Sequence, residues 1–277
     1  DKLLDLLRFF ILCFCLSALA QESDLKIGQW KSHLPYHAGN WVTQSETTVY
    51  YASPFALFTI EKEDFAVDFI STIDGLSDVG INKIKYNKNL ASLLVVYDNS
   101  NIDLIKSNEI INFNDIPKNT SIVGDRTIYD ILFDGNGAFL STGFGIVKLN
   151  LEREEFEFTT FTGVPVLGMA IFEGHIYAAT NEGIYRAENN PSINLADFNN
   201  WRLLDVGDGF PAVYSTRTIA AHHNSLYFDI DGDLFTTTGI AGRPVLSIAP
   251  NEISYDNNQN LSFPNLNNLN LDFKNLG

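Results

Sequence analysis

The sequence predicts an all-β fold, a β-propeller of four-stranded antiparallel blades. Two observations predict it: a β-hairpin signature that recurs about every 44 residues, and an aromatic-rich composition. The chain has 277 residues, 45% of them hydrophobic, with 21 Phe, 11 Tyr, 3 Trp and a single Met. Flat and β-branched side chains of this kind favour sheets over helical bundles, and the length suffices for one large all-β domain.

The clearest copy of the hairpin runs from Asp134 to Asn150. Asp134 to Gly137 is predicted to turn, Ala138 to Thr142 to form a strand, and Ile146 to Asn150 to return. Gly143 to Gly145 supplies the tight reversal, because residues with a Cβ resist positive φ. These glycines are not expected to cradle a phosphate, since a phosphate loop opens into a helix and this one opens into a strand.

Four further copies share this pattern of strand, turn and strand. They occupy residues 48–60, 93–105, 175–186 and 225–237. Alternating runs precede four of the hairpins, at 80–86, 127–133, 166–172 and 216–221, and a fourth segment follows most of them, as at 156–161 and 201–204. Four short antiparallel strands per period are the signature of a propeller blade.

The two ends of the domain carry incomplete copies. Trp30 to Tyr36 is expected to be a short outer strand, ended by Pro35, that completes the last blade and closes the ring. The tail from Asn251 to Gly277 is expected to start a sixth blade. The sequence thus predicts a truncated ring with about five to six blades visible, which continues beyond Gly277.

Residues 1–20 are predicted to be a secretory signal peptide, and residues 21–277 the propeller domain. Leu6 to Leu19 is almost unbroken apolar sequence with Arg8 before its core, and it is too short to span a bilayer. Ala18 and Ala20 are the small residues that signal peptidase requires, so we expect cleavage between Ala20 and Gln21. The mature protein is therefore expected to be exported.

Cysteine content and charge exclude several classes of function. Cys13 and Cys15 lie inside the signal peptide, so the mature chain has no disulfide and no thiolate site. Leu12 and Phe14 precede them, which argues against lipid attachment. The net charge of −16, with no run of Lys or Arg, argues against nucleic acid as a partner. The acidity is interpreted as solubility, with a cation-binding or cationic-partner surface as the alternative.

Asp229, Asp231 and Asp233 alternate as calcium ligands do. Leu234 and Ile240, however, stand where an EF-hand loop needs Gly and Glu, and the segment falls where other copies have their hairpin turn. A solvated turn is therefore the preferred interpretation, with a weak metal site as the alternative.

The histidines show no ligand pattern. His222 and His223 are expected in a surface loop, because adjacent side chains of a strand point to opposite faces and would not share one ion. His33 and His37 have the spacing of one helical face, but Pro35 between them prevents the helix.

No catalytic constellation stands out either. Glu61, Glu63 and the pair Glu154-Glu155 are expected on solvated outer segments, and the chain has no Gly-x-Ser-x-Gly elbow. The sequence therefore predicts no catalytic residue, no metal site and no cofactor. It names no ligand-binding residue, since blade order does not tell which side chains point into the channel.

Two stretches resemble the "two-component regulator propeller" repeat. They are Asp-Gly-Leu-Ser-Asp-Val-Gly-Ile-Asn-Lys-Ile from Asp74 and Asp-Gly-Asn-Gly-Ala-Phe-Leu-Ser-Thr-Gly-Phe-Gly-Ile-Val-Lys-Leu from Asp134. The copies are degenerate: Leu140 to Gly143 replaces the usual Trp-containing strand, and Asn99 to Asn101 replaces a Gly turn.

The whole arrangement resembles the N-terminal part of the PorZ family. It consists of the signal peptide, Trp30-x-x-His33-Leu34-Pro35-Tyr36, Asn99-Ser-Asn-Ile-Asp-Leu-Ile105 and Asn200-Trp201. PorZ proteins are surface components of the type IX secretion system, with two propellers and a C-terminal β-sandwich. The resemblance implies a non-enzymatic binding and scaffold subunit in the periplasm or at the outer-membrane cell surface.

Within that resemblance, the subunit aids delivery of anionic lipopolysaccharide to the sortase that attaches cargo. The implied partners are the sortase and outer-membrane proteins of the secretion machine, with lipopolysaccharide or another glycan as ligand. The alternative is the periplasmic ligand-sensing propeller of a hybrid two-component system, which shares the repeat. A propeller hydrolase or lyase is a third hypothesis, and it would need a catalytic pair at the central channel.

Overall fold

The computed structural model describes residues 38–107, 109–222, 225–237 and 246–248. All of them belong to a compact unit of residues 36–277, distinct from a unit of residues 1–35. The predicted signal peptide, its cleavage site between Ala20 and Gln21, the strand from Trp30 to Tyr36 and the tail from Asn251 lie outside the described residues.

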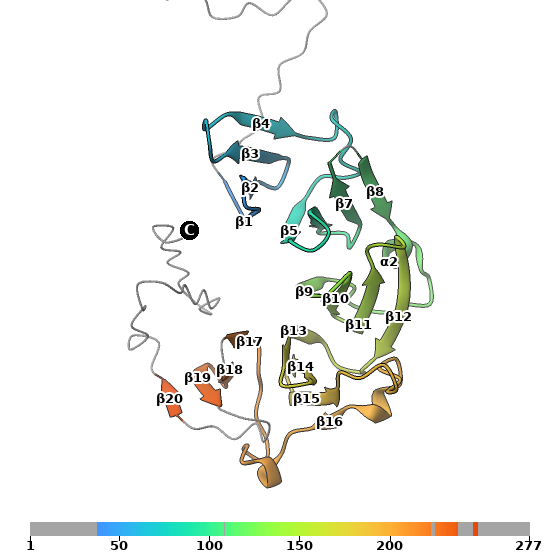
Figure 1. The fold of residues 1–277 in the computed structure, drawn as a ribbon. Coiled ribbons are helices and arrows are strands. Elements are labelled where there is room, and N and C mark those ends of the chain that lie inside the picture. The colour runs from blue at the N-terminus through green and yellow to red at the C-terminus, as the bar shows by residue number, and fades with distance from the viewer. Residues whose placement is uncertain (1–37, 108, 223–224, 238–245, 249–277) are drawn as a thin grey trace, which may run out of the picture. The chain divides into compact units, whose positions relative to one another are not determined.

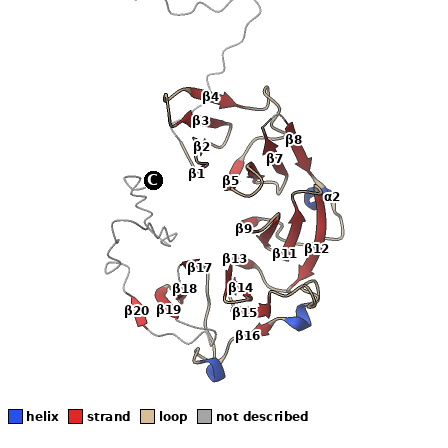
Figure 2. Ribbon diagram, viewed as in Figure 1, coloured by secondary structure: helices blue, strands red, loops and turns tan. Residues whose placement is uncertain are grey.

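The described residues form five antiparallel sheets, each built from four consecutive strands (Figures 1 and 2). Such four-stranded meanders are propeller blades, so the predicted fold class is confirmed. Blades 1 to 3 contain β1 (Trp41–Gln44), β2 (Thr48–Ala52), β3 (Leu57–Glu61) and β4 (Val67–Ile70); β5 (Ile81–Asn87), β6 (Ser92–Tyr97), β7 (Ile102–Lys106) and β8 (Glu109–Phe113); and β9 (Ile128–Asp134), β10 (Gly137–Thr142), β11 (Gly145–Asn150) and β12 (Glu155–Phe161). Blades 4 and 5 contain β13 (Val166–Phe172), β14 (His175–Thr180), β15 (Gly183–Glu188) and β16 (Arg202–Leu203); and β17 (Ile219–His222), β18 (Ser225–Ile230), β19 (Asp233–Thr237) and β20 (Leu246–Ile248).

All five predicted hairpins are present as the second and third strands of their blades. The run predicted from Thr216 begins instead at Ile219, for a physical reason. The Thr216 amide donates to the Thr180 carbonyl of the preceding blade, 2.9 Å away. The amides of Arg217 and Thr218 donate to the Asp229 carboxylate. These residues therefore anchor the connection to its surroundings before the strand starts.

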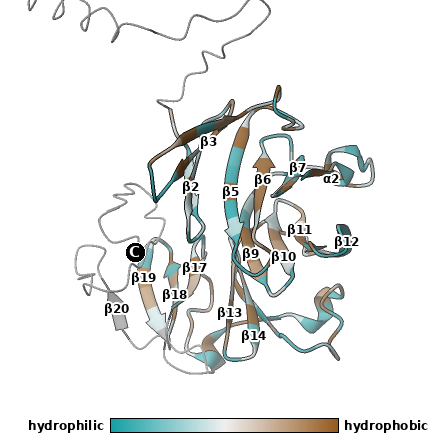
Figure 3. Ribbon diagram, turned by 45° about the horizontal axis from the view of Figure 1, so that its top comes forward, coloured by the Kyte–Doolittle hydropathy of each residue, from teal (hydrophilic) through white to brown (hydrophobic). Residues whose placement is uncertain are grey.

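The hydrophobic core lies between successive blades. The first strand of each blade contacts the first strand of the next, from β1 to β17. One buried cluster joins Leu94 and Val96 of β6 to Ala138 and Leu140 of β10, and similar clusters fill the other junctions. In Figure 3, β6 and β14 are hydrophobic, whereas much of β5 is hydrophilic.

The polar character of β5 has a structural cause. Lys83 and Lys85 donate from their ammonium groups to the carbonyls of Tyr129 and Ile131 on β9, each at 2.5 Å. The Lys83 ammonium also lies 4.1 Å from the centre of the Trp41 ring, a cation–π contact. Burial lowers the pKa of Lys83. These lysines thus join blades 1, 2 and 3 beside the innermost strands.

Helices are few and short. The described ranges contain α2 (Asp115–Lys118) and the 3₁₀ turns η1 (Phe198–Asn200) and η2 (Val206–Asp208). No helix in these ranges has the length and hydropathy of a membrane span.

Candidate functional site

The meander of each blade brings two kinds of loop to the same end of its strands. One is the turn between the second and third strands, and the other is the connection that leads to the next blade. We call this end the loop face. The turns between first and second strands and between third and fourth strands lie at the opposite end.

Exposed apolar side chains gather at the loop face. Of eleven large hydrophobic side chains exposed among the described residues, eight lie there: Trp41, Phe55, Ile73, Val79, Val123, Phe161, Val206 and Val213. The other three lie at or beside β4, namely Phe65, Val67 and Phe69. Because loops normally present polar groups to water, this concentration makes the loop face a candidate binding surface.

The connection between blades 1 and 2 is rigidly built. The Asp74 carboxylate accepts hydrogen bonds from the Ser71 amide at 2.9 Å and the Ser71 hydroxyl at 2.8 Å. Leu76 is buried, and its amide donates to the Ser71 carbonyl. Ile73 and Val79, which flank this anchor, are 81% and 52% exposed. The loop therefore holds two apolar side chains in water.

A buried carboxylate also holds the connection between blades 1 and 2. Asp103 on β7 is fully buried and accepts hydrogen bonds from the Ser77 amide at 2.8 Å, the Tyr97 hydroxyl at 2.6 Å and the Asn112 amide nitrogen at 2.9 Å. Burial of Tyr97, together with the hydrogen bond from its hydroxyl to Asp103, raises the pKa of Tyr97 far above its usual value. All three donors are satisfied by one side chain, which makes Asp103 the centre of this polar network.

The connection between blades 2 and 3 uses an arginine for the same purpose. Arg126 donates to the Ile122 carbonyl at 2.7 Å and to the Pro117 carbonyl at 2.8 Å. Ile122 is buried, whereas the next residue, Val123, is 88% exposed. The guanidinium thus satisfies backbone carbonyls and leaves a valine at the tip of the loop.

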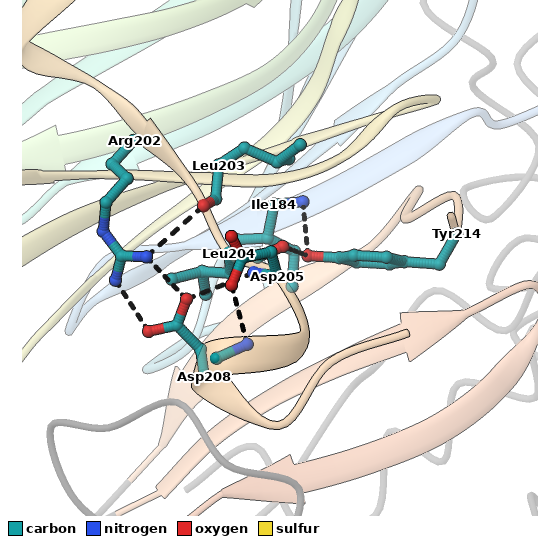
Figure 4. A network of polar contacts seen from close by, with 8 residues as sticks. Ile184, Arg202, Leu203, Leu204, Asp205, Asp208 and Tyr214 are labelled. Carbon is teal, nitrogen blue, oxygen red and sulfur yellow. Dashed lines mark hydrogen bonds and ion pairs between the residues drawn. The ribbon is translucent and has the colours of Figure 1, made fainter. Parts of the chain in front are cut away.

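The connection between blades 4 and 5 is held by the network in Figure 4. Arg202 donates to both carboxylate oxygens of Asp208, at 2.6 and 2.7 Å. Asp208 also accepts from the Asp205 amide at 3.1 Å, and the Asp205 carboxylate accepts from the Gly207 amide at 2.8 Å, which forms a capping box. The hydrogen bond from Arg202 holds the pKa of Asp208 below its usual value.

Tyr214 anchors the second half of this connection (Figure 4). Its hydroxyl donates to the Leu204 carbonyl at 2.9 Å and accepts from the Ile184 amide at 3.1 Å. The ring is buried and stacks on Phe210, and burial raises the pKa of Tyr214 to about 12. The preceding residue, Val213, is 88% exposed. In this third connection, as in the other two, hydrogen bonds hold the base of the loop and a valine is exposed.

Replacing Asp208 with asparagine should make the free energy of unfolding depend less on pH in the acid range. The folded-state pKa lies below the unfolded value of about 4, so the ion pair stabilises the fold above about pH 4 and is lost as pH falls through the folded pKa. Because Arg202 is half exposed, we expect the pair to contribute no more than about 1 kcal/mol. Urea unfolding at several pH values should show the difference between wild type and Asp208→Asn shrinking towards pH 2; a constant difference would contradict this account.

The structure separates the three aspartates considered as calcium ligands. Asp229 is buried on β18, so a solvated turn is the wrong interpretation for this residue. Asp231 is exposed in the turn and accepts from the Ser215 amide and hydroxyl, both at 2.9 Å, and Asp233 is exposed at the start of β19. Within the described residues, no three His, Cys, Asp or Glu side chains converge as metal ligands.

The other singled-out residues lie away from the loop face. His222 ends β17 opposite Ser225 and is not in a loop as expected, and His223 lies outside the described residues. Glu61 ends β3 and accepts from the Thr48 hydroxyl. Glu63 and Glu154 lie in turns at the opposite end, where Glu154 pairs with Lys106.

The exposed valines were missed by sequence reasoning. A local signal existed, since Ile73, Val79, Val123, Val206 and Val213 are β-branched residues in loops that also contain glycine and aspartate. Such residues usually occupy strands. Their exposure in these loops therefore makes them candidates for contact with a partner.

Solved structures share this fold. The chain is similar to PorZ of Porphyromonas gingivalis, described as an essential bacterial surface component of the type-IX secretion system, with 22% identity and a TM-score of 0.70 over 80% of this chain and 30% of that chain. It is also similar to the extracellular domain of BT4673 from B. thetaiotaomicron, described as a hybrid two-component system, with 14% identity and a TM-score of 0.56 over 79% and 30% of the two chains. The chain thus spans about a third of each of these proteins.

Sequence comparison separates the two relatives. No curated protein matches the chain. Residues 49–202, more than half of the chain, match the family described as "TSS9, PorZ, N-terminal beta-propeller domain". The chain belongs to the PorZ N-terminal β-propeller family of the type IX secretion system.

Proposed function

We propose that the chain is the N-terminal propeller of a non-enzymatic binding and scaffold subunit of the type IX secretion system at the cell surface. The observation that carries this proposal is the loop face, where three independently anchored connections expose apolar side chains. Rigid loops with exposed apolar groups bind without a large ordering cost, which suits recognition.

In this function the subunit binds the sortase and outer-membrane proteins of the machine, and it aids delivery of anionic lipopolysaccharide to the sortase. Family membership supports the assignment to the machine. The three connections support binding through this domain, because each holds its apolar tip by hydrogen bonds at its base.

Deletion of the gene tests the proposal. Cargo proteins should then appear in the medium without attachment to the cell surface, and the full-length gene supplied in trans should restore attachment. Surface proteolysis and fractionation of a cargo protein measure the outcome. Normal attachment of cargo in the deletion strain would contradict the proposal.

A ligand-sensing propeller of a hybrid two-component system is the second candidate. The observation that favours it is the similarity to the extracellular domain of BT4673. The complete reading frame distinguishes the two functions. A transmembrane helix followed by a histidine kinase supports the sensor, whereas a second propeller and a β-sandwich support the secretion subunit.

A further inference from the structure

We propose that the loop face of blades 1 to 3 is a docking surface for a protein whose contact area is apolar and bordered by lysine or arginine. The inference rests on the proposed function and specifies which surface carries the binding and which chemistry it selects.

Hydrogen bonds make the loops of blades 1 and 2 continuous. The Gly80 amide donates to the Pro54 carbonyl at 2.6 Å, which joins the turn that carries Phe55 to the connection that carries Val79. The Asn99 amide nitrogen donates to the Asp78 carboxylate. The middle turn of blade 2 is therefore attached to the same connection.

The surface continues from blade 2 to blade 3. The Ser100 hydroxyl donates to the Arg126 carbonyl at 2.7 Å, which attaches the connection that exposes Val123. The Gly143 amide then donates to the Thr127 carbonyl at 3.0 Å. Next to it, the rings of Phe144 and Phe161 lie 6.0 Å apart. One bonded series of loops thus crosses three blades.

The exposed side chains on this series share their chemistry. Each is large and apolar, and each is between 44% and 88% exposed: Phe55, Ile73, Val79, Val123 and Phe161. The aliphatic members are β-branched and stiff at χ1, so a partner that buries them loses little side-chain entropy. Their burial on binding is expected to be favourable at about 25 cal/mol per Å².

The charge of the same loops selects the partner. Five carboxylates lie on them and only two basic residues, namely Asp74, Asp78, Asp98, Asp115 and Asp125 against Lys118 and Arg126. The Arg126 guanidinium is turned to backbone carbonyls. An anionic lipopolysaccharide would be repelled here, whereas a protein surface with basic residues around an apolar centre is attracted.

The test uses the full-length protein carrying Val79→Ser and Val123→Ser. Phe65→Ser is the matched control, because Phe65 is 74% exposed at the opposite end of the strands. The probes are the purified sortase of the same secretion system and vesicles that contain anionic lipopolysaccharide. We expect the double variant to raise the Kd for the sortase about tenfold or more, the control to leave it unchanged, and added salt to weaken binding.

Three results would overturn the docking surface. They are failure of the wild-type protein to bind the sortase, an equal loss in Phe65→Ser, and a loss of vesicle binding in the double variant that matches its loss of sortase binding. Strains separate this inference from the proposed function. If the deletion strain releases cargo while the double-variant strain attaches it normally, only the docking surface is wrong.

Discussion

Replacing Gly145 with alanine is expected to destabilise the domain by about 3 kcal/mol or more, the largest effect of any single change considered. Gly145 starts β11 with φ of +138°, where a Cβ would lie 2.0 Å from the Thr160 carbonyl oxygen. That oxygen belongs to β12, and Gly145 is paired with Phe161 of the same strand. Neither backbone can move without breaking the ladder. Urea unfolding followed by tryptophan fluorescence measures the loss.

A second glycine separates the clash from the strain of positive φ. Gly174 has φ of +74°, and a Cβ there would meet no atom within 4 Å. Gly174→Ala should therefore cost only about 1 kcal/mol. Equal losses at both positions would show that the close approach of Thr160 has no energetic weight.

Replacing Asp103 with alanine should have the second largest effect, a loss of about 3 kcal/mol. The substitution leaves the Tyr97 hydroxyl and the Ser77 amide without their acceptor, whereas the Asn112 side chain keeps its bonds to Asn101 and Ile102. Buried donors that lose their partner carry the full cost of desolvation. Thermal and urea unfolding should both show the loss.

Asp98, an exposed aspartate in the turn between β6 and β7, is the control for Asp103. Asp98 accepts one hydrogen bond, from the Asn82 side chain at 3.1 Å, in an exposed setting. Asp98→Ala should cost less than about 1 kcal/mol, since water can replace the carboxylate. If Asp103→Ala is equally mild, the polar network does not stabilise the connection that it holds.

Much of the fold was predictable because the hairpin signals are local. Gly145 and Gly183 have positive φ where a strand begins, and Gly232 has it within a tight turn, as the sequence pattern requires. The second copy has Ser100 in this role, with φ of +67°. The Asn101 amide donates to the Asn99 side chain, so an Asx-type turn replaces the glycine. Even a degenerate copy can therefore still be recognised as a repeat.

The remaining elements depend on distant partners. β1 has only four residues, and its strand character follows from its pairing with β2. Asp229 looks like part of a solvated turn locally, but the amides that it binds at Arg217 and Thr218 lie on the preceding connection. Hydrogen bonds between residues distant in the sequence produce no periodic sequence pattern from which they could be predicted.

The candidate site was the least predictable part. Val79 and Ile122 both follow polar residues in a connection, yet Val79 is half exposed and Ile122 is buried. The sequence cannot separate them, because exposure depends on which way each loop folds over its blade. Only the anchors, such as Asp74 and Arg126, decide which apolar side chain faces water.

The consecutive order of strands within every described sheet bears on how the chain matures. Each described blade consists of four consecutive strands, so none needs a strand from a later part of the sequence. Contacts at short sequence separation form quickly, so a blade can assemble as soon as its own residues are free. A chain that emerges N-terminus first from a narrow passage can then fold one blade at a time. Each new sheet packs on the one before it, so that the apolar faces left exposed at each stage are those of the end blades.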